Sequence, residues 1–280
     1  MTWVKIKDNI IDFTVPDLIL PKSPIYAAID AVNKIVEEYP PPYNVLASGG
    51  IDSQAMLHAW KLSNQPHNVI SFQYNDDMNA HDLDTLKEFS AKENINVTYI
   101  PFDFFSFIKN EYDIMANRYQ CSSPLISAYI RFTEVLGGTC VFSGNFLGIS
   151  GAFLTHAILA LHRHSLTDSG KNTIPYFFLH TPELAYSLRN YDISTAHTHE
   201  GKIDLYKQAH FPIIPQSQKF SGFEKYKDYY DQHHGDIYKN REIRMKYARK
   251  PSQRAFDWIL RYPYEEKFND PHYKFMLNPL

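Results

Sequence analysis

The chain has 280 residues, of which 44% are hydrophobic and 21% are charged, and its formal net charge is −3. A chain of this length and composition can form one large α/β domain or a core with an appendage. The net negative charge argues against a protein that coats nucleic acids non-specifically. Two cysteines exclude a disulfide framework and suit a reducing, cytoplasmic compartment. The N-terminus lacks the apolar stretch of a signal peptide, and no run approaches roughly 18 apolar residues, so we expect no membrane span.

Residues 1–42 are predicted to form an N-terminal arm and one helix, because apolar side chains recur at helical spacing from Ser23 to Glu38. After Pro40–Pro42, short apolar runs alternate with helical stretches. The predicted strands are 43–47, 68–73, 96–101 and 139–142, and the predicted helices are 54–62, 81–94, 104–116 and 124–136. This alternation predicts an α/β fold with a buried parallel sheet of about five strands, whose carboxyl ends surround one crevice.

The alternation fails after about residue 165, where Tyr, Pro, His and charged residues dominate. Helical pieces are expected near 182–189, 222–233, 237–248 and 252–262. We therefore divide the chain into an arm and helix (1–42), an α/β domain (43–165) and a helical C-terminal extension (166–280) that packs on the active-site side.

One motif stands out in the first half of the α/β domain. The run Ser48-Gly49-Gly50-Ile51-Asp52-Ser53 directly follows the first predicted strand and leads into a helix. Adjacent glycines let a backbone turn sharply and approach a ligand closely. The helix that follows directs unpaired N–H groups and a positive dipole end at whatever fills the loop. The ligand favoured by such a loop is a polyphosphate.

This motif resembles the pyrophosphate loop (PP-loop) of the N-type ATP pyrophosphatases, the adenine nucleotide α-hydrolase superfamily, and it is distinct from a Walker loop. The resemblance implies a Rossmann-like (HUP-type) fold, with ATP and Mg²⁺ bound at the loop. It implies that Ser48, Asp52 and Ser53 are catalytic and that Asp52 faces the metal. The residues that it assigns to nucleotide binding here are Ala47, Ser48, Gly49, Gly50, Ile51, Asp52 and Ser53.

Two further strand ends belong to the expected site by the same resemblance. Phe72, Gln73 and Tyr74 end the second strand, which in the family lies beside the adenine; an ordinary strand exit is the alternative. Ser143, Gly144 and Asn145 end the fourth strand, where the family closes over the α-phosphate and ribose. The sequence then departs from the family pattern, because residues 146–149 supply no carboxylate.

Three features of the sequence extend the hypothesis. Lys219, at a predicted helix entrance, is the candidate that neutralises the leaving pyrophosphate, with Lys202 and Lys207 as rivals. Cys121 precedes a predicted helix and is a candidate nucleophile, although the chain lacks the C-x-x-C pairs of the iron–sulfur thiolases of the family; Cys140 is expected in the core. The basic segment 238–254 is a candidate for binding nucleic acid, against the alternatives of a solvated helix face or a site for an anionic small molecule.

The resemblance implies an AMP-forming ligase similar to asparagine synthetase or deazapurine nitrile synthase. Such an enzyme adenylates a carboxylate or carbonyl oxygen of a small-molecule substrate, and ammonia, an amine or sulfur then displaces AMP. One alternative is a PP-loop enzyme that modifies, for example thiolates, a tRNA or DNA base. A second is a non-catalytic nucleotide-binding protein. The sequence leaves a homo-oligomer open.

Overall fold

The computed structural model describes residues 4–7, 10–13, 22–119, 124–144, 156–188, 191 and 199–216. Its centre is one sheet of five parallel strands in the order β5-β4-β3-β6-β7. The bounds of these strands are β3 Tyr43–Leu46, β4 Asn68–Tyr74, β5 Val97–Phe102, β6 Thr139–Val141 and β7 Thr173–Ile174. A separate antiparallel pair, β1 (Val4–Lys7) and β2 (Ile10–Phe13), forms the predicted arm.

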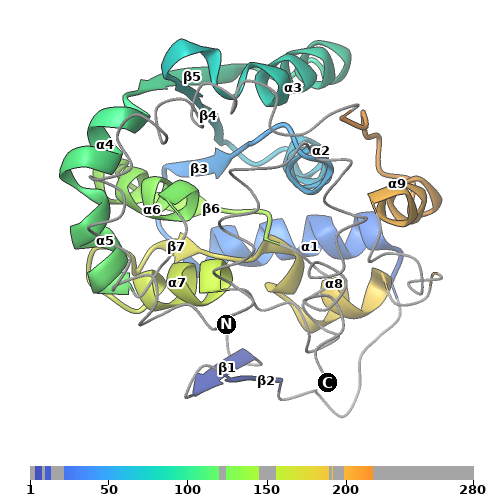
Figure 1. Cartoon of the computed structure of the whole chain (residues 1–280). Coiled ribbons are helices and arrows are strands. Elements are labelled where there is room, and N and C mark those ends of the chain that lie inside the picture. The colour runs from blue at the N-terminus through green and yellow to red at the C-terminus, as the bar shows by residue number, and fades with distance from the viewer. Residues whose placement is uncertain are drawn as a thin grey trace, which may run out of the picture.

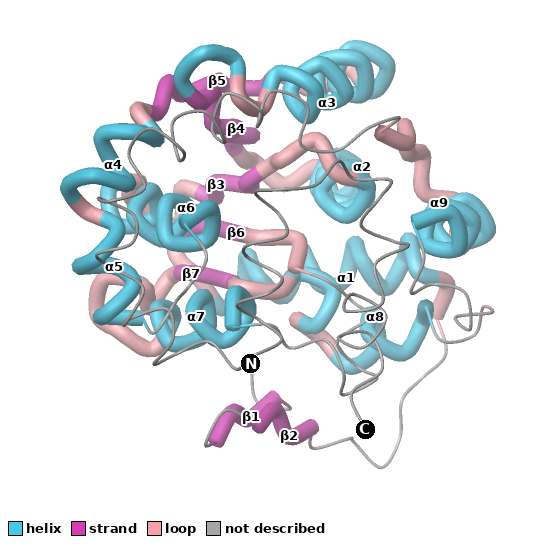
Figure 2. The backbone as a smooth tube through the Cα atoms, in the orientation of Figure 1, coloured by secondary structure: helices cyan, strands magenta, loops and turns pink. Residues whose placement is uncertain are grey.

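Helices cover both faces of the sheet and make three layers (Figure 1, Figure 2). On one side lie α1 Pro24–Glu38, α2 Ile51–Ser63, α3 Ala80–Glu93, α8 Pro182–Ser187 and α9 His199–Gln208. On the other side lie α4 Phe104–Asn110, α5 Tyr112–Tyr119, α6 Pro124–Val135 and α7 His156–Ser165. Two short 3₁₀ turns, η1 Asn75–Asp77 and η3 Phe177–Leu179, follow β4 and β7.

Side-chain alternation along the strands divides the core into two clusters. Val45, Val69 and Val141 face the layer of α1 and α2, whereas their neighbours Leu46 and Ile70 face the layer of α4 to α7. Successive side chains of a strand point to opposite faces, so a buried parallel strand must be apolar on both. This requirement explains the continuous apolar runs that identified these strands in the sequence.

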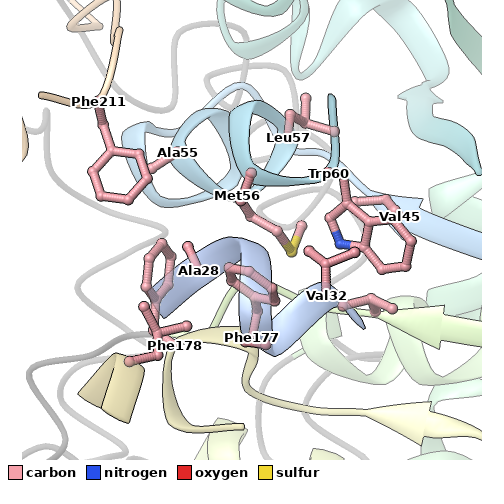
Figure 3. Close-up of a cluster of buried hydrophobic side chains, with 14 of the residues drawn as sticks. Ala28, Val32, Val45, Ala55, Met56, Leu57, Trp60, Phe177, Phe178 and Phe211 are labelled. Carbon is pink, nitrogen blue, oxygen red and sulfur yellow. The ribbon is translucent and has the colours of Figure 1, made fainter. Parts of the chain in front are cut away.

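Helix α2 packs against α1, which lies in the same layer. Figure 3 shows Met56 and Trp60 of α2 close to Ala28 and Val32 of α1, and all four side chains are fully buried. The small alanine allows the two helices to approach closely. Burial of a large apolar side chain contributes about 1.5–3 kcal/mol, so this contact fixes the position of α2 and of the loop in front of it.

The strand order reverses beside β3. The chain runs from β3 to β4 and β5 with its helices on one face, then returns through α4–α6 to β6 and β7 with its helices on the other. In open α/β sheets, ligands bind outside the carboxyl ends of the strands at such a reversal. The fold therefore presents the ends of β3 and β6 as neighbouring walls of one site.

The structure confirms the predicted α/β class and differs in two details. The fifth strand, β7, lies beyond residue 165, so the sheet continues into the stretch that the sequence assigned to the C-terminal extension. The predicted helix 104–116 is two helices, α4 and α5. The helices expected near 222–262 lie outside the described residues.

Candidate functional site

The backbone of the loop between β3 and α2 requires glycine at one of its two glycine positions. Gly49 has φ +81°, and a Cβ there would lie 2.0 Å from the backbone oxygen of Asp82 in α3. Gly50 has φ −68°, and its Cβ would meet only Ser48 Oγ at 3.5 Å and Gln216 Oε1 at 4.0 Å. Gly49 thus joins the loop to α3, whereas Gly50 leaves space on the side of Ser48.

The N-terminus of α2 keeps its hydrogen-bond donors available. Gly50 is the N-cap residue and has no side chain with which to cap the helix, and its own N–H donates to Ser48 Oγ at 3.4 Å. The first helical bond runs from Gln54 N–H to Gly50 O (3.0 Å), and Ser53 Oγ donates to the same oxygen (2.8 Å). The first N–H groups of a helix have no partner within it, and together with the dipole they favour an anion. Ser48 is exposed beside them.

The carboxylate of Asp52 is held by helix α9. Lys202 Nζ donates to Asp52 Oδ2 (2.5 Å), and Tyr206 Oη donates to Asp52 Oδ1 (2.6 Å). Burial, and next the charge of Asp52, raise the pKa of Tyr206 well above its usual value, so its hydroxyl stays protonated and donates. The structure therefore brings one of the three candidate lysines to the loop, while Lys207 is exposed on the same helix.

The sequence did not predict the roles of two polar residues beside the loop, Gln54 and Gln216. The fully buried side chain of Gln54 donates to Gly49 O (2.7 Å) and Ile214 O (2.9 Å), and accepts from Ile214 N–H (2.6 Å). Gln216 Nε2 donates to Asp82 Oδ1. Gln54 and Ile214 are separated by 160 positions and Asp82 and Gln216 by 134, so no local pattern could have joined them.

At the end of β4, two of the three predicted adenine-site side chains are buried in the core. The ring of Phe72 stacks on Phe132 with centroids 3.5 Å apart, and the buried Tyr74 shares a hydrogen bond with Tyr129. Gln73 is exposed.

The backbone at the end of β4 is also partly occupied. Asn79 Nδ2 donates to Phe72 O (2.6 Å), and Asn79 Oδ1 accepts from Tyr74 N–H (2.9 Å). Gln73 is therefore the exposed side chain of this strand end, and the role of Phe72, Gln73 and Tyr74 beside the adenine stays a prediction.

At the end of β6, Ser143 is half-buried and Gly144 has φ +65°. A Cβ on Gly144 would lie 2.9 Å from Tyr176 Cα, so glycine is required by the packing of the segment after β7. Phe178 N–H donates to Ser143 O at 3.4 Å. Both residues therefore lie at the strand reversal, as predicted. Asn145, Lys219, Cys121 and the segment 238–254 lie outside the described residues.

The described part of the chain contains no group of three or more His, Cys, Asp or Glu side chains that could hold a metal ion. Mg²⁺ commonly uses only one or two carboxylates together with substrate phosphates, so this finding leaves room for a nucleotide-bound ion. Asp52 as its ligand stays a prediction, and the ion would have to compete with Lys202. Cys140 lies in the core, where burial raises the pKa of its thiol to about 12. Among the described helices, none has the length and hydropathy to cross a bilayer.

Comparisons with known proteins add little to this geometry. No protein-family model matches the chain, and no curated protein matches it. Among solved structures, the chain is similar to a glutamine-dependent NAD⁺ synthetase from Acinetobacter baumannii in complex with adenosine diphosphate, with 12% identity and a TM-score of 0.36. The match covers 96% of this chain and 48% of the synthetase, so the chain spans about half its length. The fold assignment therefore rests on the strand order of the chain itself.

Proposed function

We propose that the chain is an ATP-using enzyme of the PP-loop type, which transfers AMP to an oxygen of its substrate and releases pyrophosphate. The observation that carries this proposal is the N-terminus of α2, which begins after Ser48-Gly49-Gly50 at the strand reversal and has no capping side chain at its N-cap residue, Gly50. The two glycines have different structural roles, because Gly49 packs on α3 and Gly50 leaves the side of Ser48 open. A polyphosphate fits the donors and the dipole that meet there.

The residues of the loop suit the binding of pyrophosphate more than covalent catalysis. The first N–H groups of α2 and the exposed hydroxyl of Ser48 would donate to phosphate oxygens, while Ser53, whose hydroxyl donates to Gly50 O, shapes the turn. Lys202 is the described lysine paired with the loop, and we propose it as the cation that balances the charge of the leaving group. Mg²⁺ would add Lewis-acid stabilisation of the phosphates. Lys219 remains the alternative cation.

The proposed reaction has two steps. A carboxylate or carbonyl oxygen of the substrate attacks the α-phosphorus of ATP, a new P–O bond forms, and the bond from the α-phosphorus to the bridging oxygen breaks. Pyrophosphate leaves with that oxygen and its electron pair. Ammonia, an amine or a sulfur nucleophile then attacks the activated carbon, the C–O bond breaks, and AMP leaves. The protein contributes positioning and charge stabilisation.

The test is a pyrophosphate-release assay of the full chain with ATP, Mg²⁺ and pooled metabolites, followed by mass spectrometry for an adenylated product. We expect stoichiometric AMP and pyrophosphate, and loss of both in Gly50→Val, whose larger side chain would project into the open side of the loop. Release of ADP and phosphate instead would contradict the proposal. Tight ATP binding without turnover would favour the non-catalytic alternative.

A further inference from the structure

One buried polar atom beside the loop makes no hydrogen bond within the described residues. Gln216 is only 4% exposed, and its Oε1 has no hydrogen-bond partner among the residues that the structure describes. The same atom lies 4.0 Å from the point that a Cβ on Gly50 would occupy. A buried acceptor without a partner is costly, and such an atom in a native protein indicates a missing ligand or water.

Asp82 fixes the direction in which the Gln216 amide points. Gln216 Nε2 donates to Asp82 Oδ1. An ionised carboxylate can only accept, so turning the amide over would place two acceptors against each other. Asp82 is itself fixed, because it lies in the first turn of α3 and its backbone oxygen touches Gly49. The acceptor of Gln216 is therefore held on the side away from Asp82.

The backbone that carries Gln216 is fixed as well. Ile214, two residues earlier, exchanges two hydrogen bonds with the buried side chain of Gln54, and Gln54 also binds the carbonyl of Gly49. The loop, α2, α3 and the segment at residues 211–216 are thus joined through side-chain amides. The position of Gln216 is therefore fixed by the fold, unlike that of a flexible side chain on the surface.

The polarity of this atom is opposite to that of the loop. The N-terminus of α2 offers donors to an anion, whereas Gln216 offers an acceptor beside it. Ionised phosphate oxygens are acceptors and cannot pair with Oε1. A ligand that satisfies both groups must carry an N–H or O–H donor next to its phosphates.

We propose that Gln216, oriented by Asp82, forms a subsite that recognises a hydrogen-bond donor placed beside the bound phosphates. This inference rests on the proposed function, because it takes the loop to be a phosphate site. Two sources share the required chemistry: a ribose hydroxyl of the nucleotide, and the ammonium ion or primary amine that supplies the second nucleophile. Asp82 is a positioning residue, and Gln216 makes the contact.

The experiment compares ligands that differ in one donor, using the full chain and isothermal calorimetry. The dissociation constant is measured for ATP, 2′-deoxy-ATP, 3′-deoxy-ATP and tripolyphosphate. The dissociation constant of pyrophosphate is measured in methylammonium chloride and, at equal ionic strength, in tetramethylammonium chloride, which has no N–H. We expect one of these contrasts, ribose or amine, to differ by about fivefold to tenfold. Equal affinities in both contrasts would overturn the proposal and assign Oε1 to an ordered water.

Variants test whether Gln216 causes the difference in affinity between donor-bearing and donor-free ligands. Gln216→Met removes the acceptor at similar volume, so the contrast should disappear while tripolyphosphate still binds within about twofold. In Asp82→Asn/Gln216→Glu, the new amide donates to the new carboxylate, whose second oxygen faces the loop. This double variant should keep the ratio between donor-bearing and donor-free ligands even if every affinity falls. Gln208→Met, at an exposed position of α9, is the matched control.

The outcomes separate this inference from the proposed function. If the unaltered chain binds neither pyrophosphate nor tripolyphosphate, the proposed function fails and the subsite fails with it. If both bind, and Gln216→Met discriminates between the ligands as well as the unaltered chain does, only the subsite is refuted.

Discussion

At the scale of single residues, the two glycines of the loop are constrained by different neighbours. Gly49 needs a positive φ and touches the backbone of α3, whereas Gly50 has an extended backbone and ordinary space around it. A left-handed conformation costs a non-glycine residue about 1–2 kcal/mol, and overpacking adds about 1–3 kcal/mol.

We therefore expect Gly49→Ala to lower the free energy of unfolding by about 2–5 kcal/mol. Gly50→Ala should lower it by less than about 1 kcal/mol, because its methyl group meets only Ser48 Oγ and Gln216 Oε1 at 3.5 Å or more. Urea denaturation of the two variants measures the difference. Equal losses of stability would show that Gly49 does not pack on α3 as described.

The ion pair between Asp52 and Lys202 is a second contact of single residues. The side chains are 22% and 12% exposed, so the pair is shielded more than a surface pair but is not fully buried. Surface pairs contribute about 0–1 kcal/mol, whereas breaking a buried pair costs about 3–5 kcal/mol.

We expect Lys202→Met to destabilise the fold by about 1–2 kcal/mol, and a double-mutant cycle with Asp52→Asn to give a coupling energy of similar size. Lys207→Met, at an exposed position of the same helix, should change stability by less than about 0.5 kcal/mol. Chemical denaturation at low salt measures the four members of the cycle and the Lys207→Met control. A coupling energy near zero would mean that α9 is held to α2 by Tyr206 and apolar contacts alone.

At the scale of elements, Gln54 connects the N-terminal turn of α2 to the extended segment at 211–216. Its amide pairs with both backbone groups of Ile214, as a neighbouring strand would. We expect Gln54→Leu to cost about 2–4 kcal/mol, because it leaves buried backbone groups without partners. Hydrogen exchange at Ile214 should accelerate at the same time. Gln65→Leu, at a partly exposed position two residues beyond the end of α2, is the control, and equal losses in the two variants would contradict this linking role.

The elements that the sequence predicted well are those with local signals. The alternation of apolar runs and amphipathic stretches located β3, β4, β5 and β6, and the glycines located the start of α2. Strand β7 has only two residues, which is too short for any periodicity, so the sheet was expected to end earlier. The family resemblance placed Phe72 beside the adenine, and no pattern in the sequence indicated that its ring stacks on Phe132 of α6.

The lack of a local signal also explains why Asp82 and Gln216, which lie beside the loop, were not predicted from the sequence. Ser48, Gly49 and Gly50 are adjacent in the sequence, and together they predict a turn. Asp82 and Gln216 meet only because α3 and the segment after α9 converge on that turn. Their contact is a property of the tertiary fold, and neither residue carries a local signature of it.

At the scale of the whole molecule, folding lowers the pKa of several buried or partly buried histidines. Burial, the largest cause, lowers the pKa of His58, His162 and His164, and lowers that of His180 to about 3. Neither ring nitrogen of His180 has a hydrogen-bond partner among the described residues. Glu38 Oε2 lies 3.7 Å from its Nε2, but this partly exposed carboxylate does not outweigh the burial.

The sign of the resulting pH dependence follows from the direction of these shifts. An unfolded histidine binds a proton below about pH 6.5, whereas folded His180 does not until about pH 3, so protons favour the unfolded chain between these values. His180 alone should therefore remove about 2 kcal/mol of stability between pH 7.5 and pH 5. Burial raises the pKa of Glu93, but Lys61 and then His58 together lower it below the usual value of 4.5, so this carboxylate adds little in this window.

Replacement of His180 by phenylalanine isolates that contribution. The phenyl ring has a similar shape and the imidazole makes no hydrogen bond within the described residues, so stability at pH 7.5 should change by less than about 1 kcal/mol. At pH 5 the variant should be more stable than the unaltered chain by about 2 kcal/mol. Guanidinium unfolding at the two pH values measures both differences. A parallel pH dependence in the two proteins would show that His180 is solvated, and the packing of η3 against α1 would then need revision.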